Sequence, residues 1–424
     1  MRVLLVGSGG REAALGWALS RSAAVTELVA APGNPGLARL AETIALDPSN
    51  PDEVVGAARR SDADLVVIGP EAPLVAGAAD RLRDDGRLVF GPDAAAARIE
   101  GSKAYAKSLM AAAGIPTGRS AVVRSLDEGA AALDLLGPPY VVKADGLAAG
   151  KGVVVTEERA EAQAALGERL SGAFGDAGRT VVIEEFLEGP ELSLIAFADG
   201  QTAVACAPAR DYKRLRDGDE GPNTGGMGSY SPVPGCDDDL VERILGEIME
   251  PLLKETAARG APFVGALYAG LALTPAGPRV IEFNARFGDP ETQALIPRLE
   301  SDLGAVCLAC ARGELSGVKL RWSPQACVSV VLAAPGYPAS PGTGAVISGV
   351  EQACCLRDVQ VFQAGTAERD GALVTAGGRV LVVSARGHGL EAARARAYEA
   401  AGLISFEGVQ RRNDIAVAGG TGLL

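Results

Sequence analysis

Short apolar runs alternate with helical patterns through the first hundred residues, and this alternation restricts the fold more than any other feature of the chain. The runs are Val3–Val6, Leu28–Ala31, Leu65–Ile68 and Leu88–Phe90. Strands that alternate with helices predict a parallel sheet covered by helices, which is the α/β class. The runs end in the turn signals GSGGRE, APGNPG, GPEAPL and GPDAAA. Because these turns follow the carboxyl ends of the strands, we expect ligands to bind at that edge of the sheet.

The whole chain, at 424 residues, is long enough for about three units of roughly 100 to 200 residues each. Residues 1–100 form the α/β unit described above. Residues 101–320 have a different texture, in which apolar runs flank a glycine-rich connection and predict a mobile flap over about residues 118–190. Residues 321–424 are rich in strand patterns and predict a third, α+β unit. The expected fold is therefore multidomain and combines α/β and α+β units.

Composition and charge exclude several classes of function. A net charge of −13 argues against nucleic-acid and anionic-membrane partners, and we expect neither. No apolar run reaches the length of a membrane span, and the N-terminus enters a strand pattern directly, so we expect a cytoplasmic protein. The single histidine, His388, argues against a histidine-based triad. We interpret Cys307 and Cys310 as buried thiols in preference to a zinc or redox site.

The first turn, Gly7–Glu12, looks at first like a dinucleotide-binding fingerprint but has Glu12 in place of the third glycine. A glycine-rich turn that opens a helix still presents free N–H groups to an anion such as a phosphate ester. Phosphate binding and a merely tight strand-to-helix turn both stay open from these residues alone.

A second glycine-rich connection, Asp145–Gly152, differs from a Walker A loop because a strand pattern follows it where a helix would be required. It predicts a hairpin flap whose amides and Lys151 close over a polyphosphate. Lys143 lies on the preceding apolar strand, where an inward ammonium needs an anionic partner, so we interpret it as a second phosphate contact. A lysine whose side chain reaches the surface is the alternative.

Polar side chains at Glu282, Asn284 and Arg286 alternate along a predicted strand and therefore share one face. Carboxylate and amide oxygens suit Mg²⁺, which takes its remaining ligands from water and phosphates. Arg286 would then face the charge that builds on a transferred phosphoryl group. An exposed strand face is the alternative.

Two further segments become candidates for ligand binding because they accompany this strand. The buried run Val182–Leu187 leads into an acidic turn that ends at Glu191, as a nucleotide base hinge and a ribose-binding carboxylate would require. The segment Arg210–Gly228 is polar and then rich in glycine, which allows close backbone approach to a small substrate. The alternatives are an acidic surface turn and a disordered surface loop, respectively.

Together these segments resemble the ATP-grasp superfamily and, within it, the glycinamide ribonucleotide synthetase family. The resemblance covers nearly the whole chain and includes KADGLAAGKGV, IEEFLEG, GPNTGGMGSYSP, IEFNARFGDPETQ and QRRNDI. It implies an N-terminal pre-ATP-grasp domain, a central ATP-grasp domain with a mobile flap and a C-terminal α+β domain. It also implies a carbon–nitrogen ligase of de novo purine biosynthesis. In that reaction ATP converts glycine to glycyl phosphate, which the amine of 5-phosphoribosylamine attacks to give glycinamide ribonucleotide, ADP and phosphate.

The resemblance also implies roles for individual residues and small-molecule substrates only, and we expect a monomer or a weak dimer. The ATP contacts are Lys103, Lys143, Gly150, Lys151, Gly152, Glu184, Glu185, Leu187 and Glu191. The substrate contacts are Gly9, Gly10, Asn34, Gly36, Glu71, Asp211, Lys213, Asn223, Thr224 and Gly225. Glu282 and Asn284 match the ligands of Mg²⁺ or Mn²⁺. The catalytic residues are Arg286, Asp289 and Lys143.

Two positions depart from the family pattern. The family usually reads GGREHAL and FHAGT where this chain has Ala13 and Gln363 in place of the histidines. Both lie outside the ATP and magnesium residues, so a relative that acts on another amino acid or sugar amine is one alternative. A dinucleotide-binding oxidoreductase is a distant one, which the first turn suggests and the magnesium strand opposes. A catalytically dead binding protein would have lost the catalytic and metal residues, all of which are present.

Overall fold

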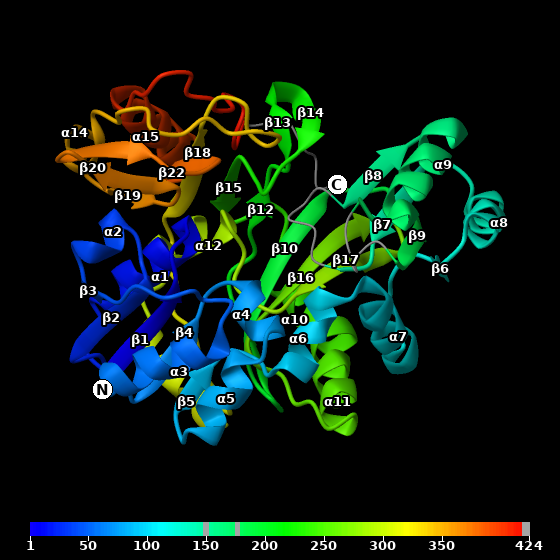
Figure 1. The fold of residues 1–424 in the computed structure, drawn as a ribbon, viewed down its shortest axis with the longest axis horizontal. Coiled ribbons are helices and arrows are strands. Elements are labelled where there is room, and N and C mark those ends of the chain that lie inside the picture. The colour runs from blue at the N-terminus through cyan, green and yellow to red at the C-terminus, as the bar shows by residue number, and fades with distance from the viewer. Residues whose placement is uncertain (147–151, 174–178, 418–424) are drawn as a thin grey trace.

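The computed structural model describes residues 1–146, 152–173 and 179–417, which fold into three units (Figure 1). The first unit is a five-stranded parallel sheet in the order β3-β2-β1-β4-β5. Its strands are β1 (Arg2–Gly7), β2 (Glu27–Pro32), β3 (Glu42–Thr43), β4 (Leu65–Ile68) and β5 (Leu88–Phe90). Its helices are α1 (Gly10–Leu19), α2 (Pro35–Ala38), α3 (Pro51–Arg60), α4 (Glu71–Val75) and α5 (Ala78–Asp84).

The four apolar runs of the first hundred residues are all strands of this sheet, which confirms the α/β class. They are apolar without a polar alternation because both faces of the sheet are buried, with Leu4 and Leu5 each fully buried on opposite faces. The strand order reverses beside β1, so the turns after β1 and β4 meet at the position where open α/β sheets bind ligands. These two turns carry Gly9 and Glu71.

The second unit is built on an antiparallel sheet in the order β11-β10-β16-β17. Its strands are β10 (Glu191–Asp199), β11 (Ala203–Ala205), β16 (Val264–Thr274) and β17 (Gly277–Asn284). The helices around it are α6 (Ala94–Gly101), α7 (Lys103–Ala113), α10 (Asp238–Ile244), α11 (Glu250–Ala258) and α13 (Leu303–Arg312), with a π-helical turn Leu245–Met249 between α10 and α11. α7 begins where the Ser102 hydroxyl accepts the Tyr105 N–H and ends at Gly114, whose φ of +67° favours glycine.

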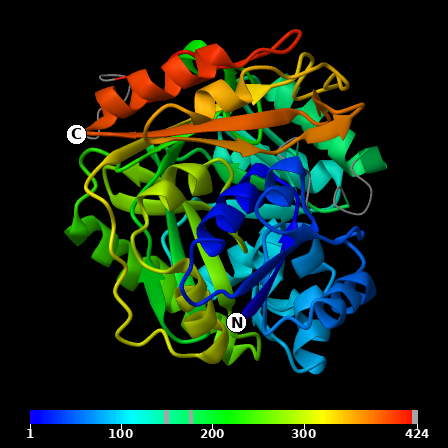
Figure 2. The same cartoon turned by 90° about the vertical axis from the view of Figure 1, so that its left-hand side faces the viewer.

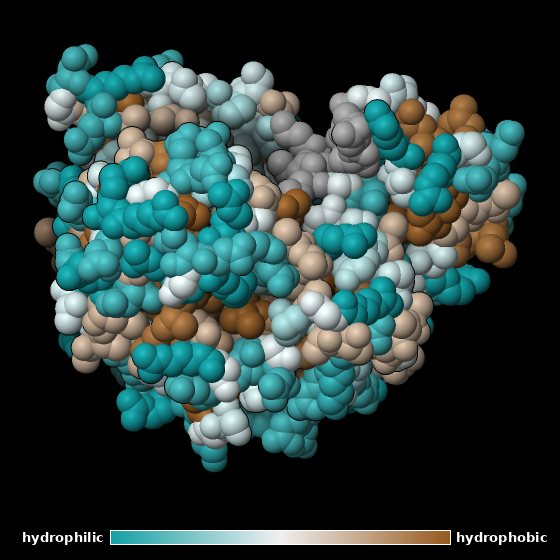
Figure 3. All heavy atoms as spheres, turned by 60° about the horizontal axis from the view of Figure 1, so that its bottom comes forward, coloured by the Kyte–Doolittle hydropathy of each residue, from teal (hydrophilic) through white to brown (hydrophobic). Residues whose placement is uncertain are grey.

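A lobe formed by a second antiparallel sheet, in the order β6-β9-β7-β8, stands beside this unit (Figure 1). Its elements are β6 (Ser120–Val123), α8 (Leu126–Leu136), β7 (Tyr140–Ala144), β8 (Val153–Thr156), α9 (Arg159–Glu168), a π-helical turn Arg169–Ala173 and β9 (Val181–Glu185). The lobe has its own hydrophobic core, to which Leu133, Val142 and Ile183 contribute. In Figure 3 a notch separates this lobe, at the right, from the rest of the surface.

The third unit is a sheet in the order β12-β15-β18-β22-β19, and it draws two strands from the middle of the chain. These are β12 (Arg210–Asp211) and β15 (Gly228–Ser231), which join β18 (Ala326–Ala333), β22 (Arg379–Gly387) and β19 (Val359–Gln363). α15 (Leu390–Leu403) lies across one face of this sheet (Figure 2). The remaining elements are α12 (Glu291–Leu295), a 3₁₀ turn Ile296–Arg298, α14 (Val350–Cys354), and the hairpins β13 (Arg214–Arg216) with β14 (Glu220–Asn223) and β20 (Thr366–Arg369) with β21 (Ala372–Thr375).

Two expectations differ from the structure in detail, and a third is confirmed. The segment Arg210–Gly228 is not an irregular loop, since it contains β12 and the β13–β14 hairpin with a 3₁₀ turn at Asp217–Asp219. The adjacent Cys354 and Cys355 are predicted from the sequence to be strand residues, but Cys354 ends helix α14 and Cys355 caps it. Cys307 and Cys310 are buried free thiols, as predicted. Among the described residues no helix is both long and apolar enough to cross a bilayer.

Candidate active site

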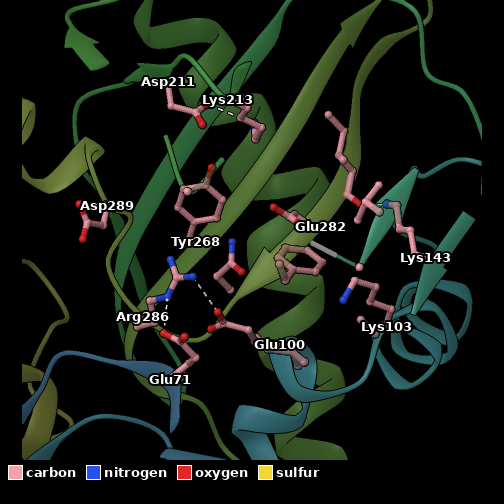
Figure 4. A pocket seen from close by; sticks show the side chains of 18 of the residues that line it. Glu71, Glu100, Lys103, Lys143, Asp211, Lys213, Tyr268, Glu282, Arg286 and Asp289 are labelled. Atoms are coloured by element: carbon pink, nitrogen blue, oxygen red, sulfur yellow. Dashed lines mark hydrogen bonds and ion pairs between the residues drawn. The ribbon is translucent and has the colours of Figure 1, made fainter. Parts of the chain in front are cut away.

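A cavity of about 530 Å³ lies where the three units meet. Its lining includes Arg11 and Glu71 from the first unit, Glu282 and Arg286 from the second, and Arg379 from the third. A second cavity of about 470 Å³ adjoins it and extends between the lobe and β17. The residues shared by the two linings are Lys143, Val153, Glu184, Asp211, Lys213, Thr224, Ile281 and Glu282. The polar residues predicted from three distant parts of the sequence therefore face one continuous space (Figure 4).

Glu282 and Asn284, at the end of β17, are two oxygen donors that the protein leaves available. Both line the first cavity, and neither side chain has a hydrogen bond or ion pair with another described residue. No cluster of three or more His, Cys, Asp or Glu side chains in the described part of the chain could hold a metal ion by itself. Two hard oxygen ligands nevertheless fit Mg²⁺, which keeps several waters and takes phosphate oxygens as ligands.

Arg286 lies two residues beyond β17, so the strand that was predicted to carry it ends before it. Its side chain still points into the same cavity as Glu282, because Glu100 of α6 and Glu71 of the first unit hold it there (Figure 4). The guanidinium Nη2 lies 2.8 Å from Glu100 Oε1, and Nε lies 3.3 Å from Glu71 Oε2. Although burial lowers the pKa of Arg286, these two carboxylates raise it above its ordinary value. The result is a fixed positive charge at the floor of the cavity.

Lys143 has the anionic partner that its buried position requires, and that partner is Glu184. The Glu184 carboxylate lies 3.1 Å from Nζ of Lys143 and 3.0 Å from Nζ of Lys107, and all three side chains are buried. Burial alone would raise the pKa of Glu184, but Lys143 and then Lys107 hold it below its ordinary value. The predicted contact of Lys143 with a phosphate stays a prediction. The Glu184 side chain itself is committed to the two lysines.

The start of the flap is tied to α7. Asp145 accepts hydrogen bonds from the Ser102 hydroxyl at 3.0 Å and from the Ala104 N–H at 2.6 Å. Lys103 donates to the Gly146 carbonyl at 3.3 Å and lines the first cavity, as does Gly152. Gly150 and Lys151, which were predicted to contact ATP, lie outside the described residues.

Glu185, Leu187 and Glu191, the predicted base and ribose contacts, line the second cavity together. Glu185 pairs with the exposed Arg119 at 3.1 Å, and Glu191 pairs with Lys213. Lys213 also lies 3.1 Å from Asp211, whose burial raises its pKa. Asn223 lines the second cavity, Gly225 lines the first, and Thr224 lines both.

The predicted substrate residues of the first unit do not all face the cavity. Glu71 does, whereas Asn34 caps α2 and crosses to the third unit. Its Nδ2 donates to the Gln363 carbonyl at 2.9 Å and to the Ser8 carbonyl at 2.8 Å. Gly36 packs against the Gln363 side chain, while a methyl group on Gly9 would lie 3.9 Å from Asp289 and one on Gly10 would press on Gln293. Asn34, Gly36 and Gly10 thus lie where the first unit meets the third, whereas Gly9 faces Glu12 and Asp289.

Several cavity residues carried no role in the sequence analysis. They are Arg11, Glu100, Lys107, Tyr268, Glu291, Tyr337 and Arg379. Glu291 lies inside the FGDPETQ motif, and its Oε1 accepts from Ser193, whose hydroxyl also bonds the buried Tyr268. Tyr337 and Arg379 lie in segments whose local patterns give no sign of a site, and the fold brings them to the cavity.

Family models match each of the three units. Residues 1–100 match the N domain of phosphoribosylglycinamide synthetase, residues 101–292 its ATP-grasp domain and residues 327–418 its C domain. A phosphoribosylamine–glycine ligase from Streptomyces coelicolor is 50% identical over 419 residues, covering 98% of this chain and 99% of the relative. One from Caulobacter vibrioides is 50% identical over 417 residues, covering 98% and 97%.

Solved structures agree with these matches. The crystal structure of phosphoribosylamine–glycine ligase from Thermotoga maritima is 37% identical and has a TM-score of 0.84, covering 98% of this chain and 100% of that one. A biotin carboxylase from Campylobacter jejuni, at 15% identity and a TM-score of 0.71 over 97% of this chain and 92% of that one, shares the fold.

Proposed function

The chain belongs to the phosphoribosylglycinamide synthetase family, and from that premise we propose that it joins glycine to 5-phosphoribosylamine with ATP. The observation that carries the proposal is the joining of Glu282, Asn284 and Arg286 in one cavity that all three units line. Two oxygen donors without a protein partner beside a fixed guanidinium suit the transfer of a phosphoryl group.

The proposed reaction has two steps. A carboxylate oxygen of glycine attacks the γ-phosphorus of ATP, and the bond to the β,γ-bridging oxygen breaks to release ADP. The amine of phosphoribosylamine then attacks the acyl carbon of glycyl phosphate, phosphate leaves, and the new amide nitrogen loses a proton. Each step develops negative charge on oxygen, which pre-placed cations stabilise where water is excluded.

Arg286, Lys103 and Lys143 are the cations that we assign to this task. Arg286 is held by Glu100 and Glu71, so it keeps its position while charge builds beside it. Lys103 and Lys143 reach the cavity from α7 and β7, on the side that the lobe covers. When bound at Glu282 and Asn284, a magnesium or manganese ion would neutralise phosphate charge.

The second cavity is the proposed site of the nucleoside. The backbone of Glu185 and Leu187 would meet the base, and Glu191 would meet the ribose hydroxyls, because all three residues line this cavity beside Val141 and Ile281. Gly150, Lys151 and Gly152 of the flap would close over the phosphates.

The remaining polar residues are assigned to glycine and phosphoribosylamine. Asp211, Lys213, Asn223, Thr224 and Gly225 approach from the β12–β15 segment, and Glu71 from the first unit. Asp289, which lies beside the Gly9 turn, would keep the sugar amine near Arg286. Since these substrates are small phosphorylated or amino compounds made inside cells, we place the reaction in the cytoplasm and propose a monomer or weak dimer.

A ligase for another amino acid or sugar amine is the second candidate, and Ala13 and Gln363 are the observation that favours it. Both positions are buried, on the contacting elements α1 and β19, so the seam near the predicted amine site differs from the family pattern. The phosphoryl-transfer residues are the same in both candidates.

An ADP-release assay with phosphoribosylamine generated in situ separates these candidates. We expect ADP release that requires both glycine and the amine, and that exceeds release with other amino acids. Turnover that is faster with another acid or amine would favour the second candidate, and no ADP release with any pair would contradict both.

A further inference from the structure

Arg379, the first residue of β22, reaches into the first cavity and binds two segments from earlier in the chain. Its Nη1 donates to the carbonyl of Gly225 at 2.5 Å and to the carbonyl of Asp289 at 2.6 Å. Its Nη2 lies 3.0 Å from Asp289 Oδ2. One guanidinium thus joins the glycine-rich segment before β15 to the predicted catalytic residue Asp289.

Tyr337 also binds the same segment. The N–H of Gly225 donates to the Tyr337 hydroxyl at 2.9 Å, and Tyr337 lines the same cavity as Arg379. A methyl group on Gly225 would lie 3.1 Å from Cζ of Arg379, and one on Gly378 would collide with the Tyr337 ring. The two glycines therefore leave room for the two gripping side chains.

The sheet topology strengthens this arrangement. β12 and β15, on either side of the Gly225 segment, pair into the sheet that contains β22. The hairpin between them is tied as well, since Arg412 donates to the Arg214 carbonyl at 3.1 Å and pairs with Asp219 at 2.7 Å. The segment that carries Asp211, Lys213 and Thr224 is thus held by the third unit at its ends, at its hairpin and at Gly225.

We propose that Arg379 is a positioning residue that, with Tyr337, fixes the Asp211–Gly228 segment against Asp289 and thereby sets the binding of glycine and phosphoribosylamine. The inference rests on the proposed function for the identity of those substrates. We assign Arg379 to positioning because its Nη1 and Nη2 both have partners in the protein. We expect a smaller effect on ATP, since the proposed base contacts at Glu185 and Leu187 lie outside this segment, although the segment also lines the second cavity at Asp211, Lys213, Asn223 and Thr224.

The charge of Arg379 has a second effect, on Asp289. Burial alone would raise the pKa of Asp289, but Arg379 and then Arg11 hold it below its ordinary value, with smaller contributions from Gln293 and Arg286. Loss of Arg379 therefore raises the pKa of Asp289. As the pH falls, any step that needs the ionised carboxylate would begin to slow at a higher pH than in the native enzyme.

The test compares Arg379→Met with Arg379→Lys and with the matched control Arg386→Met. Arg386 is on the same strand and pairs with Asp358 at 2.8 Å, on the far part of the third unit. For Arg379→Met we expect kcat/KM for glycine and for phosphoribosylamine to fall about 10- to 100-fold while the KM for ATP changes less than about 3-fold. The acid limb of its pH profile should move to higher pH. Arg379→Lys should restore the acid limb, because it keeps the charge, but not the KM values, because it loses the forked donors.

Hydrogen exchange provides a measurement that does not depend on turnover. The N–H groups of Thr224, Gly225 and Met227 should exchange faster in Arg379→Met than in the native protein and in Arg386→Met. Unchanged exchange would overturn the inference whatever the activity of the wild type. A wild type that is inactive with glycine would by itself contradict only the proposed function. Faster exchange with unchanged glycine and amine KM values in an active enzyme would also overturn it, because Arg379 would then be structural only.

Discussion

Replacing Glu184 with glutamine removes the carboxylate that pairs with Lys107 and Lys143 while it preserves the shape of the side chain. The three side chains are only 5–8% exposed, and the pair distances are 3.0 Å and 3.1 Å. Glu184→Gln therefore leaves two ammonium groups inside the protein without the charge that offsets their burial. These residues join β9, β7 and α7, so the effect should centre on the lobe and its attachment to the second unit.

The size of the loss follows from this geometry. Removing one partner of a buried ion pair costs about 3–5 kcal/mol. A stranded lysine can instead release its proton, which from an ordinary pKa of about 10.4 costs about 4.6 kcal/mol at pH 7, at about 1.36 kcal/mol per pH unit. Proton release thus limits the cost per lysine, and we expect the lobe to lose about 3–5 kcal/mol of stability at pH 7.

The pH dependence has a definite sign. In the native protein the lowered pKa of Glu184 contributes stability that is present above the unfolded value of about 4.3 and is lost as the pH falls through the folded value. Burial already lowers the pKa of Lys107, and loss of Glu184 lowers it further in the variant, so the variant regains stability as the pH rises. Between pH 7 and pH 9 we expect the loss to shrink by at least about 1 kcal/mol.

Native-state hydrogen exchange of the β7 and β9 amides at pH 7 measures the local loss, and thermal unfolding at pH 7 and pH 9 tests its sign. The matched control is Glu185→Gln on the adjacent residue. Its partner Arg119 is 64% exposed, so the control should lose only about 0–1 kcal/mol. The reasoning is refuted if Glu184→Gln is no more destabilising than this control, or if its loss is as large at pH 9 as at pH 7.

Three further substitutions test the active site. Glu282→Ala should abolish turnover. It should leave the thermal midpoint within about 2 °C, because the side chain has no hydrogen bond or ion pair in the described protein. Activity retained at saturating magnesium would overturn the metal assignment. Ala13→His should change the KM of the amine substrate more than that of ATP, with about 1–3 kcal/mol of destabilisation at this buried position; a change confined to the KM of ATP would show that the first turn is misplaced. Glu100→Gln, which keeps an acceptor for the Ala285 N–H but removes the charge opposite Arg286, should lower kcat about 10- to 100-fold in steady-state assays, and an unchanged kcat would contradict its role in holding Arg286.

Local patterns were sufficient for most of the fold. The runs Leu65–Ile68 and Leu88–Phe90 are β4 and β5 with unchanged ends, because strands buried on both faces are apolar throughout. The strand prediction at Cys354 and Cys355 was wrong because two adjacent apolar thiols near Val350 and Ala353 fit a strand as well as a short helical turn that buries only Val350 and Ala353. Short apolar runs are ambiguous between these two structures.

The site could be predicted where its residues share one strand and not where they come from distant elements. Glu282 and Asn284 alternate along β17, so their common face follows from the period of a strand. Arg286 reaches the same cavity for another reason, since Glu100 and Glu71 hold it there. Arg379 has no local signal at all, because its partners lie about ninety and one hundred and fifty residues earlier in the chain.

The grip of Arg379 on the Gly225 segment has a consequence for how such a chain can vary over evolutionary time. Nη1 donates to two backbone carbonyls, which every residue type supplies. Substitutions of neighbouring side chains in the segment therefore do not by themselves weaken these bonds. Gly225 is constrained, since a larger residue would crowd the guanidinium, and Gly226 is constrained by its φ of +110° and by Pro290. A chimera in which the third unit is exchanged with that of a relative should therefore remain compatible with this segment if the arginine and the glycine are both inherited.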